Sequence, residues 1–202
     1  MYTPYHSKYY ATQLTLKRPS NSIEKIASSL SGAKVDLNPH QIDAALFALR
    51  SPLSNGVLLA DEVGLGKTIE AAMVIAQYWA ERKRRILLIV PASLRNQWLS
   101  ELDEKFYIKS IILESKNYNQ MKRAGYIHPF EVKDKVVICS YHFAAKMADE
   151  IASVPWDLVL MDEAHRLRNV YKPSNIIGNT LKIALANRKK NCCLLLPRSK
   201  TR

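Results

Sequence analysis

Short apolar runs alternate with helical patterns along most of this sequence, and this alternation constrains the fold more than any other feature. Because the runs are apolar at successive positions, both faces of each expected strand are buried. Helices between such strands predict an α/β fold with a parallel sheet covered on both sides. The expected strands are Val57–Ala60, Ile86–Val90, Ile111–Leu113, Val136–Cys139 and Leu158–Met161.

Helical patterns fill the segments between these runs. Asn38 and Pro39 are typical of an N-cap followed by proline at the first helical position. Residues 1–35 show little periodicity, and we expect an N-terminal arm there with a short helix near Ile23–Leu30. The further expected helices are Ile69–Arg82, Leu94–Phe106, His142–Ala152 and Pro173–Leu185.

The charge balance points to a polyanionic partner. The 202 residues carry 30 lysines and arginines against 18 acidic residues, a formal net charge of +12. Such an excess favours nucleic acid, although a protein that is merely basic remains the alternative. The hydrophobic share of 48% supports a packed core and excludes disorder throughout.

Cysteine usage and hydropathy indicate a protein of a reducing, intracellular compartment. There are three cysteines, and none forms a CxxC pair, so we expect neither a disulfide framework nor a cysteine-based zinc site. The segment Met1–Arg18 lacks the apolar stretch of a signal peptide. No apolar run approaches the roughly 20 residues that span a bilayer. We therefore expect a cytoplasmic protein, nucleoid-associated if bacterial.

A glycine-rich segment between an expected strand and an expected helix is typical of a phosphate-binding loop. Gly64 and Gly66 would let backbone N–H groups turn toward phosphates, and the helix would add its positive dipole end. Lys67 would reach the β- and γ-phosphates, and the Thr68 hydroxyl would ligate Mg²⁺. An ordinary glycine turn is the alternative. The segment reads Asp61-Glu62-Val63-Gly64-Leu65-Gly66-Lys67-Thr68.

A second polar cluster, Asp162-Glu163-Ala164-His165, follows the apolar run Leu158–Met161. Ligands of open α/β sheets bind at the carboxyl ends of the strands, so this cluster and the glycine-rich segment are expected at one edge. Asp162 would hold Mg²⁺, Glu163 would orient and deprotonate the attacking water, and His165 would sense the γ-phosphate. A solvated loop with a surface histidine is the alternative.

At these residues the chain resembles the Swi/Snf-type ATPases of helicase superfamily two, from about Leu37 to Lys190. An aspartate at position 61 is normal for the first motif of that branch, and Asp162–Asn169 resembles its extended DEAH box. The stretch Pro91–Trp98 resembles the next motif, which touches the DNA backbone, and Ser140-Tyr141 resembles a later DNA-side motif. Gln41 falls where the family has an adenine-contacting glutamine; a polar residue on an exposed helix face is the equal alternative.

The resemblance implies an ATP-binding, RecA-like first lobe over residues 36–190 that uses ATP and Mg²⁺ and acts on double-stranded DNA. Ser93, Arg95 and Asn96 are the implied phosphate contacts, which would be sensitive to salt. Trp98 and Leu94 are expected in the core because they share a helix face. An RNA helicase fragment and a non-catalytic nucleotide-binding remnant of a broken gene are the alternative functions.

The last twelve residues, 191–202, depart from the family pattern, which places a strand ending in Ser/Thr-Ala-Thr and then a second lobe with arginine fingers. Codons allowed for residues 191–202 read, one frame over, Leu-Leu-Leu-Thr-Ala-Thr-Pro-Leu-Gln-Asn-Ser. Lys189-Lys190-Asn191 can also be encoded by a run of adenines. We therefore expect a frameshifted tail whose apolar residues still occupy the missing strand's place, and a truncated chain that by itself lacks turnover.

Overall fold

The computed structural model describes residues 38–50, 56–61, 66–167, 174–186 and 191–197, together with residues 32–35 and the single positions 3, 8, 30 and 172. The helix expected near Ile23–Leu30, the loop Glu62–Leu65 and the positions Arg168 and Asn169 lie outside the described residues, apart from Leu30.

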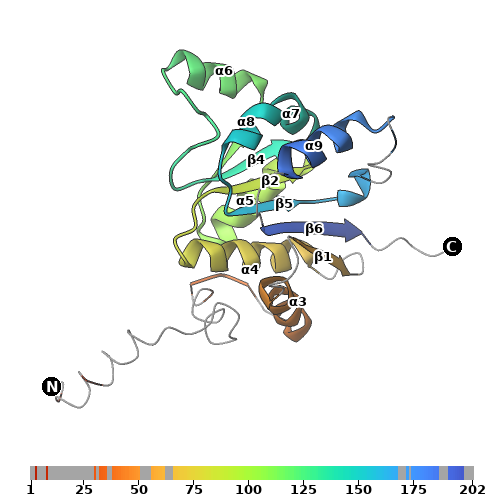
Figure 1. Cartoon of the computed structure of the whole chain (residues 1–202). Coiled ribbons are helices and arrows are strands. Elements are labelled where there is room, and N and C mark those ends of the chain that lie inside the picture. Colours follow the sequence, from red (N-terminus) through yellow and green to blue (C-terminus); the bar gives the residue numbers. More distant parts are fainter. Residues whose placement is uncertain are drawn as a thin grey trace.

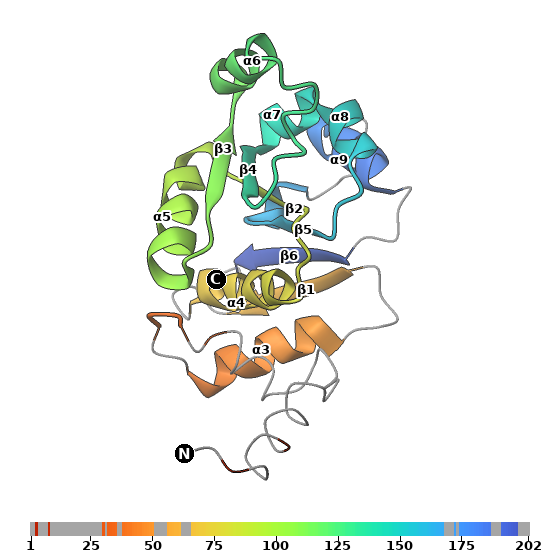
Figure 2. The same ribbon diagram turned by 90° about the vertical axis from the view of Figure 1, so that its left-hand side faces the viewer.

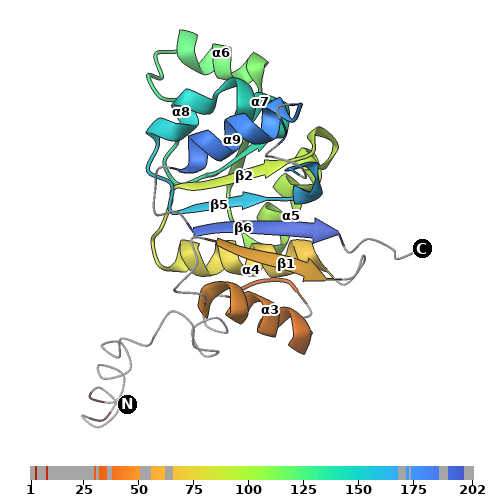
Figure 3. The ribbon, with the colours of Figure 1, turned by 45° about the vertical axis from the view of Figure 1, so that its right-hand side comes forward.

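Six parallel strands form one sheet in the order β1-β6-β5-β2-β4-β3. Figure 3 shows β1, β6, β5 and β2 side by side with their arrows pointing the same way. The expected parallel α/β sheet is confirmed, and each expected strand is present. The strands are β1 (Gly56–Asp61), β2 (Ile86–Val90), β3 (Ser110–Leu113), β4 (Val136–Ser140), β5 (Leu158–Met161) and β6 (Asn191–Pro197).

Helices connect the strands and mostly match the sequence pattern. They are α3 (Pro39–Arg50), α4 (Lys67–Ala80), α5 (Arg95–Phe106), α6 (Ser115–Arg123), α7 (Tyr141–Lys146), α8 (Ala148–Ser153) and α9 (Ile176–Ala186), with short 3₁₀ turns η1 (Ala92–Leu94) and η2 (Ala164–Leu167). Within the described part of the chain, no helix combines the length and apolarity that crossing a membrane requires.

Two helical segments differ from the expectation. The pattern predicts one helix over His142–Ala152, but the chain bends at Met147, where φ is −103° and ψ is 26°. This bend separates α7 from α8, so that Phe143 and Ile151 both face the core. Helix α6 is not predicted because it is polar and buries only Tyr118. It is instead fixed at its start by a capping box between Glu114 and Asn117.

Alternate side chains of each central strand enter two separate cores. In β2, Ile86, Leu88 and Val90 pack with α3, α4 and α5 on one face of the sheet. Leu87 and Ile89 pack with α7, α8 and α9 on the other face. Figure 1 shows α3 and α4 on one side of the sheet and α7, α8 and α9 on the other, and Figure 2 shows α5 beside β3. Burial on both faces explains the unbroken apolar runs.

Strand β6 lies inside the sheet, between β1 and β5. Its backbone pairs in parallel with β1 from Gly56↔Cys192 to Asp61↔Pro197. It also pairs with β5 from Leu158↔Asn191 to Met161↔Leu194. The expectation that the apolar part of residues 191–202 takes a strand's place is therefore confirmed for the backbone.

The parallel order brings several loops to one edge. Strands β1 and β5 are separated by β6 alone, and β2 and β4 follow on the other side of β5. The segments that leave the carboxyl ends of these strands contain the glycine-rich loop, the Pro91–Trp98 stretch, Ser140-Tyr141 and the acidic cluster. Residues far apart in the sequence thus meet at the edge where α/β sheets bind ligands.

Candidate nucleotide and magnesium site

The glycine-rich segment ends in a left-handed turn that starts α4. Gly66 has φ 88° and ψ 32°, a conformation that glycine adopts without a steric penalty. Its carbonyl oxygen accepts hydrogen bonds from the N–H groups of Ile69 at 2.7 Å and Glu70 at 3.1 Å. Lys67 and Thr68 are the first residues of α4 and are half-buried. The side chains expected to meet the phosphates and the metal are therefore at a helix N-terminus.

Gln41 lies against this turn. Its side chain is buried, and its Oε1 accepts a hydrogen bond from the Asn38 N–H at 3.2 Å. A Cβ placed on Gly66 would lie 2.2 Å from Gln41 Nε2, so the amide of Gln41 would have to shift to admit a larger residue. The alternative of an exposed helix face is wrong for Gln41. Its contact with adenine stays a prediction.

Asp162 is fixed through both its backbone and its carboxylate. Its N–H donates to the Ile89 carbonyl at 2.9 Å, which extends the ladder between β5 and β2. Its Oδ2 accepts from Trp98 Nε1 at 2.9 Å, and its Oδ1 accepts from the Glu163 N–H at 2.7 Å. Burial raises the pKa of the Asp162 carboxyl, while these two hydrogen bonds and the positive charge of Lys67 counteract that rise.

Glu163 and His165 follow in a constrained turn. Glu163 has φ 54°, in the left-handed region that few non-glycine residues adopt, and such strain is common at functional sites. Its Oε2 lies 2.8 Å from Nδ1 of His165, and both side chains are half-buried. The contact is an ion pair when the imidazole is protonated. The expected carboxylate and the expected γ-phosphate sensor therefore touch each other.

Two aromatic residues support the acidic cluster, and sequence reasoning missed this role for both. Trp98 is 1% exposed, which confirms the expectation of a core residue, but its indole N–H also holds Asp162. The Tyr141 hydroxyl donates to the Asp162 carbonyl oxygen at 2.6 Å. Only their positions in the sequence could have indicated this role. Trp98 follows β2, which pairs with β5, and Tyr141 follows β4, which pairs with β2.

The implied DNA contacts lie where β2 leads into α5. Ser93 and Asn96 are exposed there. Arg95 is half-buried, with Nη1 at 2.9 Å from Glu114 Oε2 and Nε donating to the Ala92 carbonyl at 3.1 Å. A phosphate would therefore share the Arg95 guanidinium with Glu114.

The second DNA-side motif points inward. Ser140 and Tyr141 are both buried. The Ser140 Oγ accepts a hydrogen bond from the Phe143 N–H at 3.2 Å and thereby caps α7. In the described structure, this motif stabilises the loops at the carboxyl edge.

The donor set suits Mg²⁺, which prefers oxygen ligands and binds through one or two carboxylates together with substrate phosphates and water. Asp162 offers a half-buried, oriented carboxylate, and Thr68 offers a hydroxyl on α4, which packs beside β5. Among the described residues there is no group of three or more His, Cys, Asp or Glu side chains suited to a metal.

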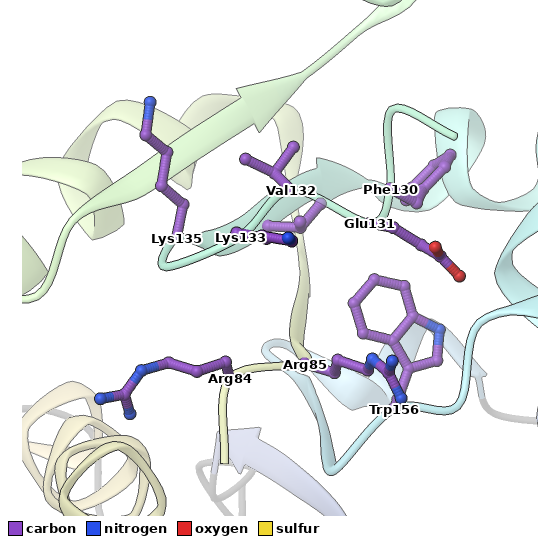
Figure 4. A pocket seen from close by; sticks show the side chains of 9 residues that line it. Arg84, Arg85, Phe130, Glu131, Val132, Lys133, Lys135 and Trp156 are labelled. Atoms are coloured by element: carbon purple, nitrogen blue, oxygen red, sulfur yellow. The ribbon is translucent and has the colours of Figure 1, made fainter. Parts of the chain in front are cut away.

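A separate pocket of about 150 Å³ lies at the opposite edge of the sheet. Figure 4 shows that its side chains come from the loops before β2 and β4, with Trp156 from the segment before β5. None of the site residues predicted from the sequence lines it. Its lining residues are Arg84, Arg85, Phe130, Glu131, Val132, Lys133, Lys135, Val137 and Trp156.

Two curated relatives match the chain over most of its length. The RNA polymerase-associated protein RapA of Serratia proteamaculans (strain 568) is 40% identical over 144 residues, which is 69% of this chain and 15% of that protein. RapA of Yersinia enterocolitica serotype O:8 matches with the same identity and coverage. The chain thus spans about 15% of the length of these relatives.

A solved structure and a family model agree with these matches. The Sulfolobus solfataricus SWI2/SNF2 ATPase core in complex with dsDNA superposes with a TM-score of 0.66 at 23% identity, over 81% of this chain and 32% of that chain. A model of the SNF2-related domain matches residues 14–192 and so begins before the boundary expected at residue 36. The chain belongs to the SNF2-related domain family, within the Swi/Snf-type branch of helicase superfamily two, and has the α/β, RecA-like fold of an N-terminal lobe.

Proposed function

We propose that this lobe binds Mg-ATP at the carboxyl edge of its sheet and serves a DNA-dependent ATPase that moves along double-stranded DNA. One observation supports this function most directly. The oriented Asp162 carboxylate, whose pKa burial raises, lies within the electrostatic influence of Lys67 at the start of α4. A half-buried carboxylate beside a lysine and a helix N-terminus suits a magnesium-bound phosphate chain.

Each residue of the site has a proposed part in this function. Backbone N–H groups of the glycine-rich segment would surround the phosphates, and Lys67 would contact the β- and γ-phosphates. Thr68 and Asp162 hold Mg²⁺, which neutralises charge on the phosphates when bound. Glu163 orients the attacking water and accepts its proton. His165, in contact with Glu163 at 2.8 Å, responds to the γ-phosphate. Gln41 contacts the adenine.

Double-stranded DNA is the proposed polyanion. The SWI2/SNF2 core to which this fold is similar was solved with dsDNA, and the net charge of +12 suits such a partner. Ser93, Arg95 and Asn96 would bind phosphates without reading the sequence, so affinity should fall steeply as salt rises. Binding that ignores salt or selects a sequence contradicts this proposal, and a preference for RNA favours an RNA helicase.

The relatives' name also suggests an association with RNA polymerase, as in RapA. Such a partner would place the protein in the cytoplasm, at the nucleoid. Retention of purified RNA polymerase by the immobilised chain, and its absence on a charge-matched control protein, would test this association.

By themselves, the 202 residues should bind Mg-ATP weakly and hydrolyse it at the background rate. Arginine fingers in phosphoryl transfer are worth about 10³–10⁵ in rate, and in this family a second lobe supplies them. The competing reading, a nucleotide-binding remnant without catalysis, gives the same result for this chain alone. Robust DNA-stimulated turnover by the purified chain contradicts both.

We also propose that residues 191–202 arise from a shifted reading frame, as the Thr-Ala-Thr string in the alternative frame suggests. The nucleotide sequence that encodes residues 185–202 and the following few hundred bases tests this directly. An adenine run and an open alternative frame that encodes a second lobe would support the proposal. An alternative frame that closes at once contradicts it.

Equilibrium titration with ATP in the presence of Mg²⁺ tests the proposed nucleotide site. We expect Lys67→Ala to reduce the affinity at least tenfold, because a lysine at this place contacts two phosphates. Lys116→Ala is the matched control, since Lys116 is an exposed lysine on α6. Equal affinities for the wild type and Lys67→Ala exclude the proposed site.

A further inference from the structure

Trp98 is a buried side chain that donates a hydrogen bond to the acidic cluster, Asp162–His165. It belongs to α5 and packs in the core formed with α3 and α4, with 1% of its surface exposed. Its only polar atom, the indole N–H, donates to Asp162 Oδ2 at 2.9 Å. A neutral tryptophan in the core therefore donates its single N–H to a carboxylate, which gives a charge-assisted hydrogen bond.

Tyr141 holds the same residue from another element. Its hydroxyl donates to the Asp162 carbonyl oxygen at 2.6 Å, and 3% of its surface is exposed. Glu163, which follows Asp162 in the sequence, has φ 54° and donates its N–H to the other carboxylate oxygen of Asp162. The backbone and side chain of Asp162 are thus fixed at separate points, from α5 and from α7.

The orientation of the carboxylate has consequences for a metal. With Oδ2 held by Trp98 and Oδ1 held by the Glu163 N–H, the plane of the carboxylate is set, and its remaining lone pairs face a defined direction. Hydrogen-bond partners of a metal ligand orient it, and their loss costs typically 10–100-fold in metal affinity. Trp98 also favours the charged form of Asp162, which is the form that binds a cation.

We propose that Trp98 and Tyr141 are positioning residues that hold the Asp162 carboxylate ready for magnesium, Trp98 through the side chain and Tyr141 through the backbone. This inference rests on the proposed function, because it assigns Asp162 to the metal. It predicts that the two aromatic residues control the metal dependence of nucleotide binding and leave binding of metal-free ATP nearly unchanged.

The chain offers matched controls for both residues. Trp156 is a buried tryptophan whose indole N–H donates to the Ile151 carbonyl at 2.9 Å. Tyr118 is a buried tyrosine whose hydroxyl donates to Glu150. Both belong to the core that also contains Tyr141, and their hydrogen bonds go to residues outside the acidic cluster. Trp156→Phe and Tyr118→Phe therefore remove the same atoms from a similar environment away from the site.

The test is calorimetric titration of ATP into each variant, with Mg²⁺ and with EDTA. We expect the gain in affinity that Mg²⁺ provides to fall about tenfold in Trp98→Phe. A smaller fall is expected in Tyr141→Phe, because its bond reaches only the backbone. Trp156→Phe and Tyr118→Phe should keep the wild-type gain even where their thermal stability drops as much.

The outcomes distinguish a failure of the proposed function from a failure of the positioning role. A wild-type chain that shows no magnesium-dependent ATP binding contradicts the proposed function. Wild-type binding with the same magnesium gain in Trp98→Phe as in Trp156→Phe overturns the positioning role alone. A fall in affinity that is equal with Mg²⁺ and with EDTA also overturns it, since a merely structural defect acts on both.

A second measurement covers the case in which Trp98→Phe does not fold. The chain has three tryptophans, so Trp79→Phe combined with Trp156→Phe leaves Trp98 as the sole one. Because its indole N–H is bonded to Asp162, its emission should change when Mg²⁺ and ATP are added together and not with ATP in EDTA. Identical spectra in the two conditions contradict the proposal.

Discussion

Asp162 shows how a single residue trades stability for function. Burial raises the pKa of its carboxyl, so the folded protein binds that proton more tightly than the unfolded chain does. The ionised carboxylate therefore lowers the free energy of unfolding at neutral pH, and this loss disappears in acid, where both states are protonated. Such a loss of stability is expected for a carboxylate that is placed to bind a positively charged ligand.

Relative to the wild type, Asp162→Asn should consequently be more stable at pH 7 than at pH 4, because it carries no charge. The substitution also loses one hydrogen bond at every pH, because the carboxylate accepts from both Trp98 and the Glu163 N–H and asparagine has a single side-chain oxygen. The pH-dependent gain over the wild type should shrink as the pH falls through the raised pKa of Asp162 in the folded state, and it should vanish below the ordinary aspartate pKa of about 4. Urea denaturation at a series of pH values measures it, with the exposed Asp149→Asn as control. An asparagine variant that is less stable at pH 7 than at pH 4, relative to the wild type, goes against this account.

Gly66 is favoured by its positive φ and by its contact with the Gln41 side chain, and the two effects can be measured apart. A residue with a Cβ at φ 88° costs about 1–2 kcal/mol, and the Cβ would also lie 2.2 Å from Gln41 Nε2. Gly125→Ala is a matched control, because Gly125 has φ 92° and nothing lies within 4 Å of the added atom. We expect Gly66→Ala to destabilise the chain clearly more than Gly125→Ala does.

The excess should come from Gln41. In a Gln41→Ala background, the cost of Gly66→Ala should fall to about that of Gly125→Ala, since only the backbone strain remains. Chemical denaturation of the four variants gives these differences. An unchanged cost in the Gln41→Ala background would show that Gln41 does not press on the turn.

Residue types and spacing predicted which residues are candidates for the site, but not the contacts that hold them. Lys67 and Asp162 could be placed at one edge because each follows a parallel strand or starts the next helix. The role of Trp98 could not be predicted, because its apolar spacing explains its burial and nothing in one sequence shows where a single N–H points. The burial of Gln41 depends on how α3 meets the turn at Gly66, which is a tertiary contact.

At the scale of elements, β6 is the strand on which the sheet depends. It is the only sheet neighbour of β1 among the described strands, whereas β5 also pairs with β2. A chain that ends at residue 190 should therefore lose the hydrogen-exchange protection of Val57–Asp61, while β2 and β4 keep theirs. A chain that ends after Pro197 is the control. Full protection of β1 without residues 191–202 would contradict the observed pairing.

The start of α5 gives a prediction for DNA binding. Glu114 pairs with Arg95 at 2.9 Å, and exposed ion pairs are worth at most about 1 kcal/mol. Glu114 also caps α6, and a glutamine keeps a side-chain oxygen for that cap, so Glu114→Gln should lower stability by about 1 kcal/mol at most. It should free Arg95 for a phosphate, which tightens binding of duplex DNA by up to about fivefold. Fluorescence anisotropy measures this affinity, with Glu131→Gln at the opposite edge as control. Weaker binding by Glu114→Gln than by the control would show that Arg95 does not contact DNA.

The elements themselves were largely predictable, for a physical reason. Strands buried on both faces leave unbroken apolar runs, which periodicity detects, and Ile86–Val90 and Leu158–Met161 were predicted to the residue. Helix α6 was not predicted, because it buries one aromatic ring and is held by its cap. The break at Met147 was not predicted, because no glycine or proline marks it. In both cases local pattern carries too little information about packing.

For the whole molecule, the central claim is that two loops 95 residues apart in sequence, around Lys67 and Asp162, form one site because the sheet order brings their strands together. The two RapA relatives are much longer, and the chain covers about 15% of their length.

A double-mutant cycle on Mg-ATP affinity tests this claim most directly. The affinity is measured by titration up to millimolar nucleotide for the wild type, Lys67→Ala, Asp162→Asn and the double variant. Because both side chains act on one magnesium–phosphate unit, we predict strong coupling, with the double variant binding little worse than the weaker single variant. Fully additive losses, or an affinity that neither substitution changes, would contradict the account.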